Sequence, residues 1–490
     1  MSKLHLGVCQ KIITPKVGAL LYGYRPNLVS TSVADDLTVS AFYFCQRETK
    51  ALMLSVTVGT INTNLDNEIR TMLSETFSIN KDVIILSSTH THSAPNLTGT
   101  SGWGDIDREY YNEILIPAIL DCTKTAIQNT LPVKVGVGTG ESDVGINRRE
   151  TNADGQSVLG QNPLGSYNPK MTILTFKDYN ENTVGTIIHY GCHGTCAGES
   201  TEISRDWSGF MTDAISKAGG EVTAFFNGCE GDVGPRLSNG KTVGFGNFEY
   251  VREIGKTASK DALKIFSSVN TFEDMSLNVN FKTAKIPLKP RIITEEAEAI
   301  FEEYQNETTN HRALIRHYAE TVLKANKENK PEEDYRCFRQ TLIGIGNCVF
   351  ASFPYEPFSK IGIDIDNVIS SFDNELLKAK KLAGQNSTLV IVSEKLFNLD
   401  EIVKTIASET GRDTRSSVLG HIQRGGTPTA MERVNATRFG YYAVKLLSEG
   451  ITGVCVGLKD GELVHEDIYN ALKKETEVSA ELLEVIDNLK

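Results

Sequence analysis

Residues 82–92, DVIILSSTHTH, form an apolar run that ends in a polar segment with two histidines. A short apolar run of this kind predicts a buried strand. Residues 37–45 and 51–58 predict two earlier strands, and residues 65–77 predict an amphipathic helix. This order indicates an α/β fold, and in open α/β sheets ligands gather at the carboxyl ends of the strands.

The pattern of an apolar run with a polar end recurs three times. Residues 183–198 predict a strand that opens into a loop of glycine, cysteine and histidine. Residues 221–235 predict a strand that opens into an acidic, glycine-rich loop. After a charged helical stretch over residues 295–334, residues 341–358 predict one more apolar strand with a polar end.

The character of the sequence changes near Asp366. A chain of 490 residues exceeds one ordinary hydrophobic core and predicts two or three domains. Residues 364–387 predict a helix and a turn, and a compact series of β and α segments follows, with a long helix over about residues 428–449. We therefore expect a first domain over residues 1–366 and a second over residues 367–490.

Composition limits the kinds of partner and the cellular location that we expect for the chain. The formal net charge of −12 argues against nucleic acid or an anionic membrane surface as the main partner. Residues 1–18 lack the apolar core of a signal peptide, and no stretch has the apolar length of a membrane helix. The nine cysteines show no framework spacing, which favours reduced thiols. We expect a cytoplasmic protein with no membrane anchor, and the oligomeric state stays open.

Two histidines and three further residues at strand ends form a candidate metal site. His90 and His92 lie two apart, so in extended backbone their side chains project to the same side. Neutral imidazole is a common metal ligand and suits zinc. An isolated pair of histidines is a weak signal, but His193, Asp232 and Glu356 stand at the ends of three other predicted strands. A catalytic zinc usually takes three protein ligands and leaves one position for water.

Five motifs, spread over residues 4–365, resemble the N-terminal catalytic domain of the neutral/alkaline non-lysosomal ceramidase family. In chain order they are SSTHTHSAP, INRR (146–149), CHGT (192–195), GDVGP (231–235) and FPYEPFSKIG (353–362). The resemblance implies a zinc-dependent hydrolase domain that cleaves the amide bond of ceramide, releasing sphingosine and a fatty acid.

Carried over to this chain, the resemblance implies a role for five residues. His90, His193 and Glu356 would bind the zinc ion. His92 would line the site and assist the carbonyl or a hydroxyl group of the substrate. Arg148 would contact the substrate.

The chain departs from that family at two points. The family motif reads GDVSP with a serine proposed as catalytic, whereas this chain has Gly234 there. A mechanism that requires this serine is excluded, whereas hydrolysis by a metal-activated water is not. The family's tyrosine ligand, in a GYxPT-like segment, has no counterpart here. Cys192 and Cys196 could serve as thiolate ligands, although packing at the strand ends is favoured. Asp232 is expected to organise its loop, with orientation of a ligand as the alternative.

The C-terminal part contains a candidate phosphate site. Residues 411–426, GRDTRSSVLGHIQRGG, place arginines and a histidine around a short strand and a Gly-Gly turn. Guanidinium groups bind phosphate bidentately and keep their charge at physiological pH. The interruption by SSVL and the two glycines favour an anion site over a solvated helix face.

Residues 376–474 resemble the C-terminal part of bacterial ATP-dependent 6-phosphofructokinases. The resemblance implies a partial α/β domain whose sugar-phosphate ligands are Arg415, His421 and Arg424 for the 6-phosphate and Glu394 for the sugar hydroxyls. The family's GGDGS-type and TIDND-type segments are absent from the chain. Without them a phosphate clamp cannot transfer a phosphoryl group.

Three hypotheses follow. The favoured one is a ceramidase-like, zinc-dependent amidohydrolase that acts on a small N-acyl (ceramide-like) or ester substrate, with a C-terminal fragment that adds no chemistry. The second is a 6-phosphofructokinase-related protein that binds a sugar phosphate. The third is a chimeric join near Asp366 with no integrated function, since natural fusions usually join whole domains.

Overall fold

The structure is a computed structural model. It describes residues 2–100, 103–152, 155–242, 244, 246–307, 311–332, 335–366, 403–404, 407, 415–416, 430–459 and 461–472. The chain divides into two units, Met1–Asn367 and Val368–Lys490, and each is described by itself.

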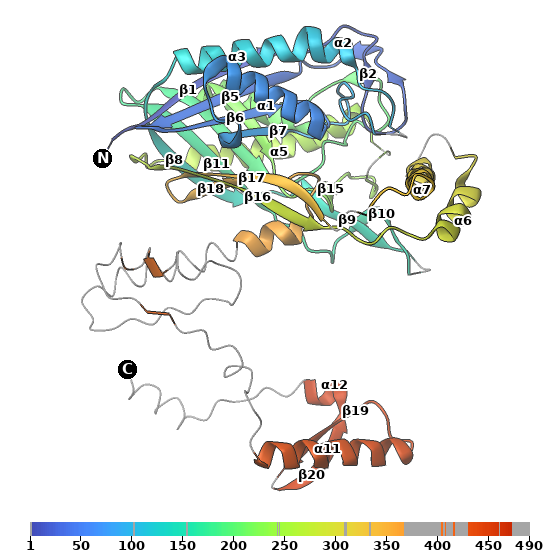
Figure 1. The fold of residues 1–490 in the computed structure, drawn as a ribbon. Helices are drawn as coiled ribbons and strands as arrows, with labels where there is room; N and C mark the ends of the chain where they lie inside the picture. The colour runs from blue at the N-terminus through green and yellow to red at the C-terminus, as the bar shows by residue number, and fades with distance from the viewer. Residues whose placement is uncertain are drawn as a thin grey trace. The chain divides into compact units, whose positions relative to one another are not determined.

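An eight-stranded sheet forms the centre of the first unit (Figure 1). Its order is β14-β12-β11-β8-β1-β5-β6-β7, with β12 parallel to β14, β6 parallel to β7 and the other pairs antiparallel. The strands are β1 (Leu4–Ile12), β5 (Thr38–Gln46), β6 (Thr49–Val56), β7 (Ile84–Ser88), β8 (Leu131–Glu141), β11 (Lys170–Asp178), β12 (Thr183–Tyr190) and β14 (Val222–Asn227). Helices and strands mix in one unit, so the predicted α/β class is confirmed.

The sheet curls so that strands far apart in its order meet. The Ser55 hydroxyl on β6 donates a 2.6 Å hydrogen bond to the carbonyl of Phe225 on β14. Alternate side chains of the strands fill the concave face, where Phe42, Phe44 and Phe176 pack together. The curl brings the carboxyl ends of β7, β12 and β14 into one region, where the loops that follow them can meet.

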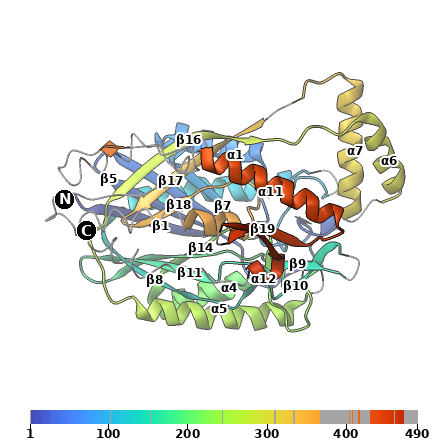
Figure 2. The same cartoon turned by 90° about the horizontal axis from the view of Figure 1, so that it is seen from below.

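Helices cover the outer faces of the curled sheet. The helices α1 (Thr63–Phe77) and α3 (Ile116–Gln128) pack on β1, β5 and β6, whereas α4 (Trp207–Ile215) and α5 (Phe248–Ser268) pack on β11, β12 and β14. Figure 2 shows α1 and α5 on opposite sides of the sheet. Leu65, Ile69 and Leu73 recur every fourth residue along α1 and are buried, which is the apolar stripe that the sequence predicts there.

A second, antiparallel sheet lies beside the first and leads to Glu356. It contains β16 (Leu277–Pro287), β17 (Tyr335–Ile345) and β18 (Cys348–Ala351), and α6 (Thr294–Tyr304) and α7 (His311–Lys327) connect its first two strands. The prediction of one strand over residues 341–358 is wrong, because the chain reverses at Gly346, whose φ of 60° lies in the left-handed region. The Thr341 hydroxyl donates a 2.9 Å hydrogen bond to the Asp82 carbonyl just before β7.

A small three-stranded sheet completes the frame of the site. It has the order β10-β9-β15, with β9 (Gly145–Thr151), β10 (Ser157–Asn162) and β15 (Val233–Pro235). Other short elements of the first unit include β2 (Leu20–Leu21), β3 (Leu28–Val29), β4 (Ser32–Val33), η1 (Lys81–Val83), α2 (Arg108–Tyr110), η2 (Tyr111–Leu115), β13 (Glu202–Ile203) and η3 (Ser216–Gly220).

The second unit is described over fewer residues. The helix α11 (Ala430–Ser448) falls within the helix predicted over residues 428–449, and β19 (Val454–Lys459) pairs antiparallel with β20 (Glu462–Asp467) before α12 (Ile468–Leu472). Among the described residues, no helix combines the length and the apolar character that a membrane crossing needs.

Candidate metal centre

Two loops that follow neighbouring strand ends bring the predicted histidines together. His90 follows β7 and His193 follows β12. Asn227, at the end of β14, joins the loops, because its amide donates to the Thr89 carbonyl at 3.1 Å and its oxygen accepts from the Cys192 N–H at 3.2 Å. The His92 N–H also donates to the Gly194 carbonyl at 3.0 Å. The site is therefore built on backbone that several hydrogen bonds fix.

The backbone at His90 is not the extended chain that the sequence predicts. The strand β7 ends at Ser88, and His90 has a φ of 63°, in the left-handed region. This conformation is uncommon for a residue with a side chain. The His90 N–H donates to the Val58 carbonyl at 3.0 Å, which holds the turn in place. The two rings still converge, with 3.3 Å between the Nε2 atoms of His90 and His92.

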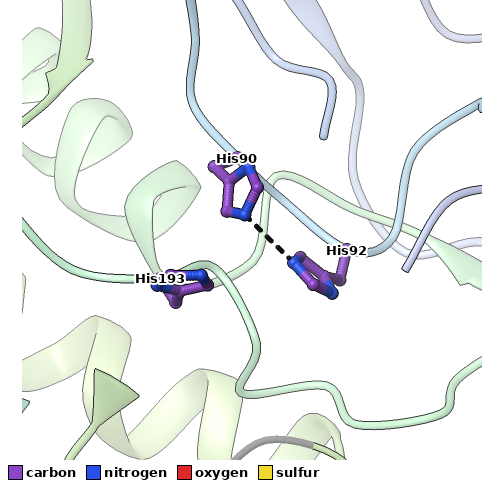
Figure 3. Close-up of side chains that lie close together, drawn as sticks. All are labelled: His90, His92 and His193. Atoms are coloured by element: carbon purple, nitrogen blue, oxygen red, sulfur yellow. Dashed lines mark hydrogen bonds between the residues drawn. The ribbon is translucent and has the colours of Figure 1, made fainter. Parts of the chain in front are cut away.

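Backbone carbonyls orient two of the three imidazoles. The Nδ1 of His90 donates to the Gly59 carbonyl at 2.6 Å, and the Nδ1 of His193 donates to the Val233 carbonyl at 3.0 Å. A neutral imidazole that donates through Nδ1 has its lone pair on Nε2, and such a hydrogen bond is the usual way in which a metal-binding histidine is oriented. The three histidines are only 1 to 6% exposed, and their ligand atoms lie within 4.8 Å of one another (Figure 3).

Glu356 faces both Nε2 atoms from the turn after β18. Its Oε1 lies 3.3 Å from the Nε2 of His90 and its Oε2 lies 3.1 Å from the Nε2 of His193. Two ligands of a tetrahedral zinc ion, each about 2.0 to 2.1 Å from it, are separated by roughly 3.3 Å. Glu356 is the exposed member of the group, with 39% of its side chain accessible, so the site opens to solvent on its side.

The charges of the group suit a cation. Burial lowers the pKa of His90, that of His92 further and that of His193 to about 4, so all three imidazoles are neutral at neutral pH. Burial also favours protonated Glu356, but the contact with His193 and the positive charge of Arg148 outweigh it and hold the pKa of Glu356 well below its usual value. Nitrogen lone pairs and a carboxylate thus converge, which is a donor set for a divalent transition metal.

His92 is packed differently from the other two histidines. Its ring lies 4.9 Å from the ring of Tyr22 and 5.3 Å from that of Tyr24. A Cβ on Gly23 would lie 2.8 Å from the His92 ring, so glycine there makes room for it. Its buried Nδ1 has no hydrogen-bond partner within the described part of the chain. His92 therefore lines the centre, and its assisting role stays a prediction.

Arg148, on β9, lies beside Glu356. Its Nε and Nη2 donate to the Gly231 carbonyl at 3.3 and 2.9 Å, and Nη2 lies 3.6 Å from the Oε2 of Glu356. The side chain is mostly buried, and a guanidinium stays charged even so. Arg148 therefore favours the ionised form of Glu356, whereas its predicted contact with substrate stays a prediction.

Asp232 holds the turn that contains Glu356. Its carboxylate accepts hydrogen bonds from the Ser359 N–H at 2.6 Å, the Ser359 hydroxyl at 3.2 Å and the Asn147 amide at 3.4 Å. The Gly231 N–H donates to the Pro357 carbonyl at 3.0 Å. Asp232 thus organises its own loop and also fixes the backbone that positions Glu356.

Three further buried residues lie at the centre or beside its loops, and no sequence motif marks them. Tyr22 stacks on Trp103, with 5.4 Å between ring centroids, and its ring lies edge-on to His90 at 5.8 Å. Glu230 is buried, and burial together with the charge of Glu356 raises its pKa to about 8. Thr242 is buried next to Gly234. These residues belong to none of the motifs, and only the folded structure shows that they lie close to them.

The remaining predicted residues contribute nothing to the centre as described. Cys192 and Cys196 lie in the apolar core, where burial raises the pKa of each thiol well above its usual value. In the second unit, Arg415 is exposed. Glu394, His421 and Arg424 lie outside the described residues.

Comparison with known families gives two matches. A family model described as "Neutral/alkaline non-lysosomal ceramidase, N-terminal" matches residues 5–283, which is more than half of the chain. A model described as "Phosphofructokinase" matches residues 358–447. The two matches bear out both resemblances of the sequence.

Solved structures resemble the chain in fold. The neutral ceramidase from Pseudomonas aeruginosa aligns with a TM-score of 0.57 and 17% identity, over 78% of this chain and 66% of that one. A structure described as "Ceramidase complexed with C2" aligns with a TM-score of 0.56 and 16% identity, over 78% of this chain and 67% of that one.

Curated relatives match the C-terminal part. The ATP-dependent 6-phosphofructokinase of Teredinibacter turnerae is 51% identical over 90 residues, 18% of this chain and 28% of the relative. That of Vibrio cholerae is 39% identical over 145 residues, 29% of this chain and 42% of the relative. The chain therefore spans less than half the length of these curated relatives.

Proposed function

Because the chain belongs, through residues 5–283, to the neutral/alkaline non-lysosomal ceramidase family, we propose that it is a zinc-dependent hydrolase of an acylated small molecule. The bond cleaved is an amide, as in a ceramide-like N-acyl substrate, or an ester. The observation that supports this most is the convergence of two Nε2 lone pairs and a carboxylate at His90, His193 and Glu356.

These three residues are the proposed zinc ligands. The backbone carbonyls of Gly59 and Val233 keep the protons of His90 and His193 on Nδ1 and leave Nε2 available. When bound there, zinc would lower the pKa of water and polarise the scissile carbonyl. Zinc also suits a set of nitrogen and oxygen ligands with one open position.

Other residues of the chain hold the substrate and exclude water. We assign to His92 a hydrogen bond to the carbonyl or a hydroxyl group of the substrate, since it lines the centre beside both ligands. Arg148 is assigned a contact with a polar group of the substrate, because its charge lies beside Glu356. The rings of Tyr22 and Tyr24 pack against His92 and limit access of water from that side.

The proposal is tested by metal content and turnover of the purified full-length chain. We expect about one zinc per chain, measured by mass spectrometry of the metal, and hydrolysis of at least one member of a panel of N-acyl amides and esters that includes a short-chain ceramide. A chelator should abolish turnover, and added zinc should restore it. A metal-free protein inert to the whole panel, or turnover that survives chelation, would contradict the proposal.

A pair of histidine variants distinguishes loss of the metal centre from a general effect of replacing a histidine. His193→Ala should lose the bound zinc and lower kcat/KM by about 100-fold or more. His317→Ala is the matched control, since the His317 imidazole also faces a carboxylate, 3.4 Å from Glu320, but on α7. The control should keep both metal and turnover.

For the C-terminal segment we propose binding of a sugar phosphate without phosphoryl transfer. The 51% identity to a 6-phosphofructokinase over 90 residues supports the first part, and the absence of the phosphate-binding and catalytic segments supports the second. The proposed ligands are Arg415, His421, Arg424 and Glu394. The full chain should bind fructose 6-phosphate in calorimetry and show no ATP-dependent phosphorylation of it. Turnover abolished by Arg424→Ala would contradict this account.

A further inference from the structure

The space beside Gly234 is filled by a hydroxyl group from another segment. A Cβ built on Gly234 would lie 2.4 Å from the Oγ1 of Thr242 and 3.4 Å from the Cβ of Arg148. Oxygen and carbon cannot approach so closely, so no side chain fits at position 234 while Thr242 stays where it is. The Thr242 hydroxyl therefore takes the place at which a residue-234 side chain would begin.

This hydroxyl is buried and lacks a hydrogen-bond partner in the described part of the chain. Thr242 is 1% exposed, and its Oγ1 makes no hydrogen bond to any described residue. A buried hydroxyl without a partner costs stability, and such groups are rare in native structures. Local costs of this kind persist where a ligand or a reaction uses the group.

The segment that contains Thr242 is anchored to β10. The Gln161 amide on β10 donates to the Leu237 carbonyl at 2.9 Å and to the Lys241 carbonyl at 2.7 Å, which fixes the backbone just before Thr242. Gly234, against which the hydroxyl lies, directly follows Val233, whose carbonyl accepts from the Nδ1 of His193. The hydroxyl thus lies against Gly234 on β15, the strand that orients His193, and the Cβ of Arg148 is close to the same glycine.

We propose that the Thr242 hydroxyl contacts the substrate and donates a hydrogen bond to the oxygen on which negative charge develops during hydrolysis. This inference rests on the proposed hydrolase function. A donor role fits better than a nucleophilic one, because no described base accepts the proton of Thr242 and a nucleophilic hydroxyl needs such a base. The hydroxyl that the resemblance places at position 234 is supplied here by a residue from a different segment.

Four variants at positions 242 and 234 test the hydroxyl itself. Thr242→Val keeps the shape and removes the donor, so kcat/KM should fall by about 100-fold, as for other oxyanion donors. Thr242→Ser should recover most of that loss. In the double variant Gly234→Ser with Thr242→Ala, the added serine hydroxyl occupies the vacated space, and turnover should exceed that of Thr242→Ala by about tenfold.

Two readouts do not depend on turnover. Thr242→Val should melt at the same or a higher temperature than the wild type, because it removes an unpartnered buried hydroxyl. The zinc-loaded wild type should bind octanoate, whose carboxylate resembles the developing charge, about tenfold more tightly in calorimetry than zinc-loaded Thr242→Val.

The outcomes separate this inference from the hydrolase proposal. A wild type that turns over no panel substrate would contradict the hydrolase proposal, whereas tighter octanoate binding through Thr242 would still show that the hydroxyl donates to a bound carboxylate. Equal octanoate affinity in wild type and Thr242→Val, or no octanoate binding by the wild type, would overturn the role of Thr242. A lower melting temperature of Thr242→Val would also overturn it, because the hydroxyl would then be a structural group.

Discussion

Asp232 holds Glu356 in place through the intervening turn, and a metal site depends on such contacts as much as on its ligands. Asp232→Asn keeps the volume and weakens the acceptor for the Ser359 N–H and hydroxyl. We expect the dissociation constant for zinc to rise about tenfold, with little change in melting temperature. Competition with a zinc-binding dye measures the dissociation constant.

Ser359→Ala is the matched control for Asp232→Asn. It removes only the 3.2 Å hydroxyl contact and leaves the 2.6 Å bond from the Ser359 N–H. Its effect on zinc affinity should therefore be smaller than that of Asp232→Asn. Unchanged zinc affinity in both variants would show that the turn holds Glu356 without Asp232.

Glu230 makes stability depend on pH. Its pKa rises from an ordinary value near 4.5 to about 8 in the folded chain, first because of burial and then because of Glu356. Between these values the unfolded chain releases this proton and the folded chain keeps it, so stability falls as pH rises from about 4.5 to about 8. Glu230→Gln, which stays neutral, should gain stability over the wild type as pH increases.

Urea unfolding of metal-free protein at pH 5, 7 and 8.5 measures this difference. The free-energy gap between Glu230→Gln and wild type should widen from pH 5 to pH 8.5 and then level off. A gap that is constant across these pH values would show that the folded chain holds Glu230 with an ordinary pKa.

At the residue scale, the sequence motifs located the residues that the structure gathers at His90, His193 and Glu356. They could not locate Asn227, because it contacts Thr89 far away in the chain, or Thr242, because only the fold turns its hydroxyl toward Gly234. The same holds for the carbonyl partners of the histidines, since any residue has a carbonyl and only the fold decides which one lies nearby.

At the scale of elements, the cap of α1 connects a helix to the site loop. The Asn62 Oδ1 accepts from the Leu65 N–H at 3.0 Å, and its amide donates to the Thr98 carbonyl, also at 3.0 Å. Asn62→Ala should lower the free energy of unfolding by about 1 to 2 kcal/mol. Asn247→Ala, which removes an exposed cap of α5, is the control and should cost less. Equal losses in the two variants would mean that the Thr98 contact adds nothing.

The sequence predicted the kinds of elements better than their ends. The strands β5, β6 and β12 and the helix α1 lie where apolar periodicity predicts them. The end of β7 was misplaced, because the turn at His90 depends on a hydrogen bond to Val58 on the neighbouring segment. The hairpin of β17 and β18 was missed, because one glycine inside an apolar run is a weak turn signal.

At the scale of the whole molecule, the described residues of the metal centre all belong to the unit Met1–Asn367. The boundary near Asp366 is a proposal, and removal of residues 367–490 tests it. The shortened chain should fold cooperatively, bind zinc with an affinity within about threefold of the full chain and keep its turnover. Loss of folding in the shortened chain would show that the two parts depend on each other.

The hypothesis of a chimeric join near Asp366 can be tested by ligand binding. A chimeric join without integrated function predicts that addition of fructose 6-phosphate changes neither zinc affinity nor hydrolysis. If the two sites are coupled, each ligand must change the affinity for the other by the same factor. A calorimetric titration with zinc, done with and without the sugar phosphate, is therefore sufficient. A change in zinc affinity would instead support a functional connection between the two parts.

The central claim is that His90, His193 and Glu356 hold one metal ion, and anomalous scattering tests it most directly. Crystals of the zinc-loaded chain, measured on both sides of the zinc absorption edge, should show one strong peak about 2.0 to 2.2 Å from the Nε2 of His90, the Nε2 of His193 and a carboxylate oxygen of Glu356. No peak at these three residues, or a single peak elsewhere in the chain, would contradict the claim.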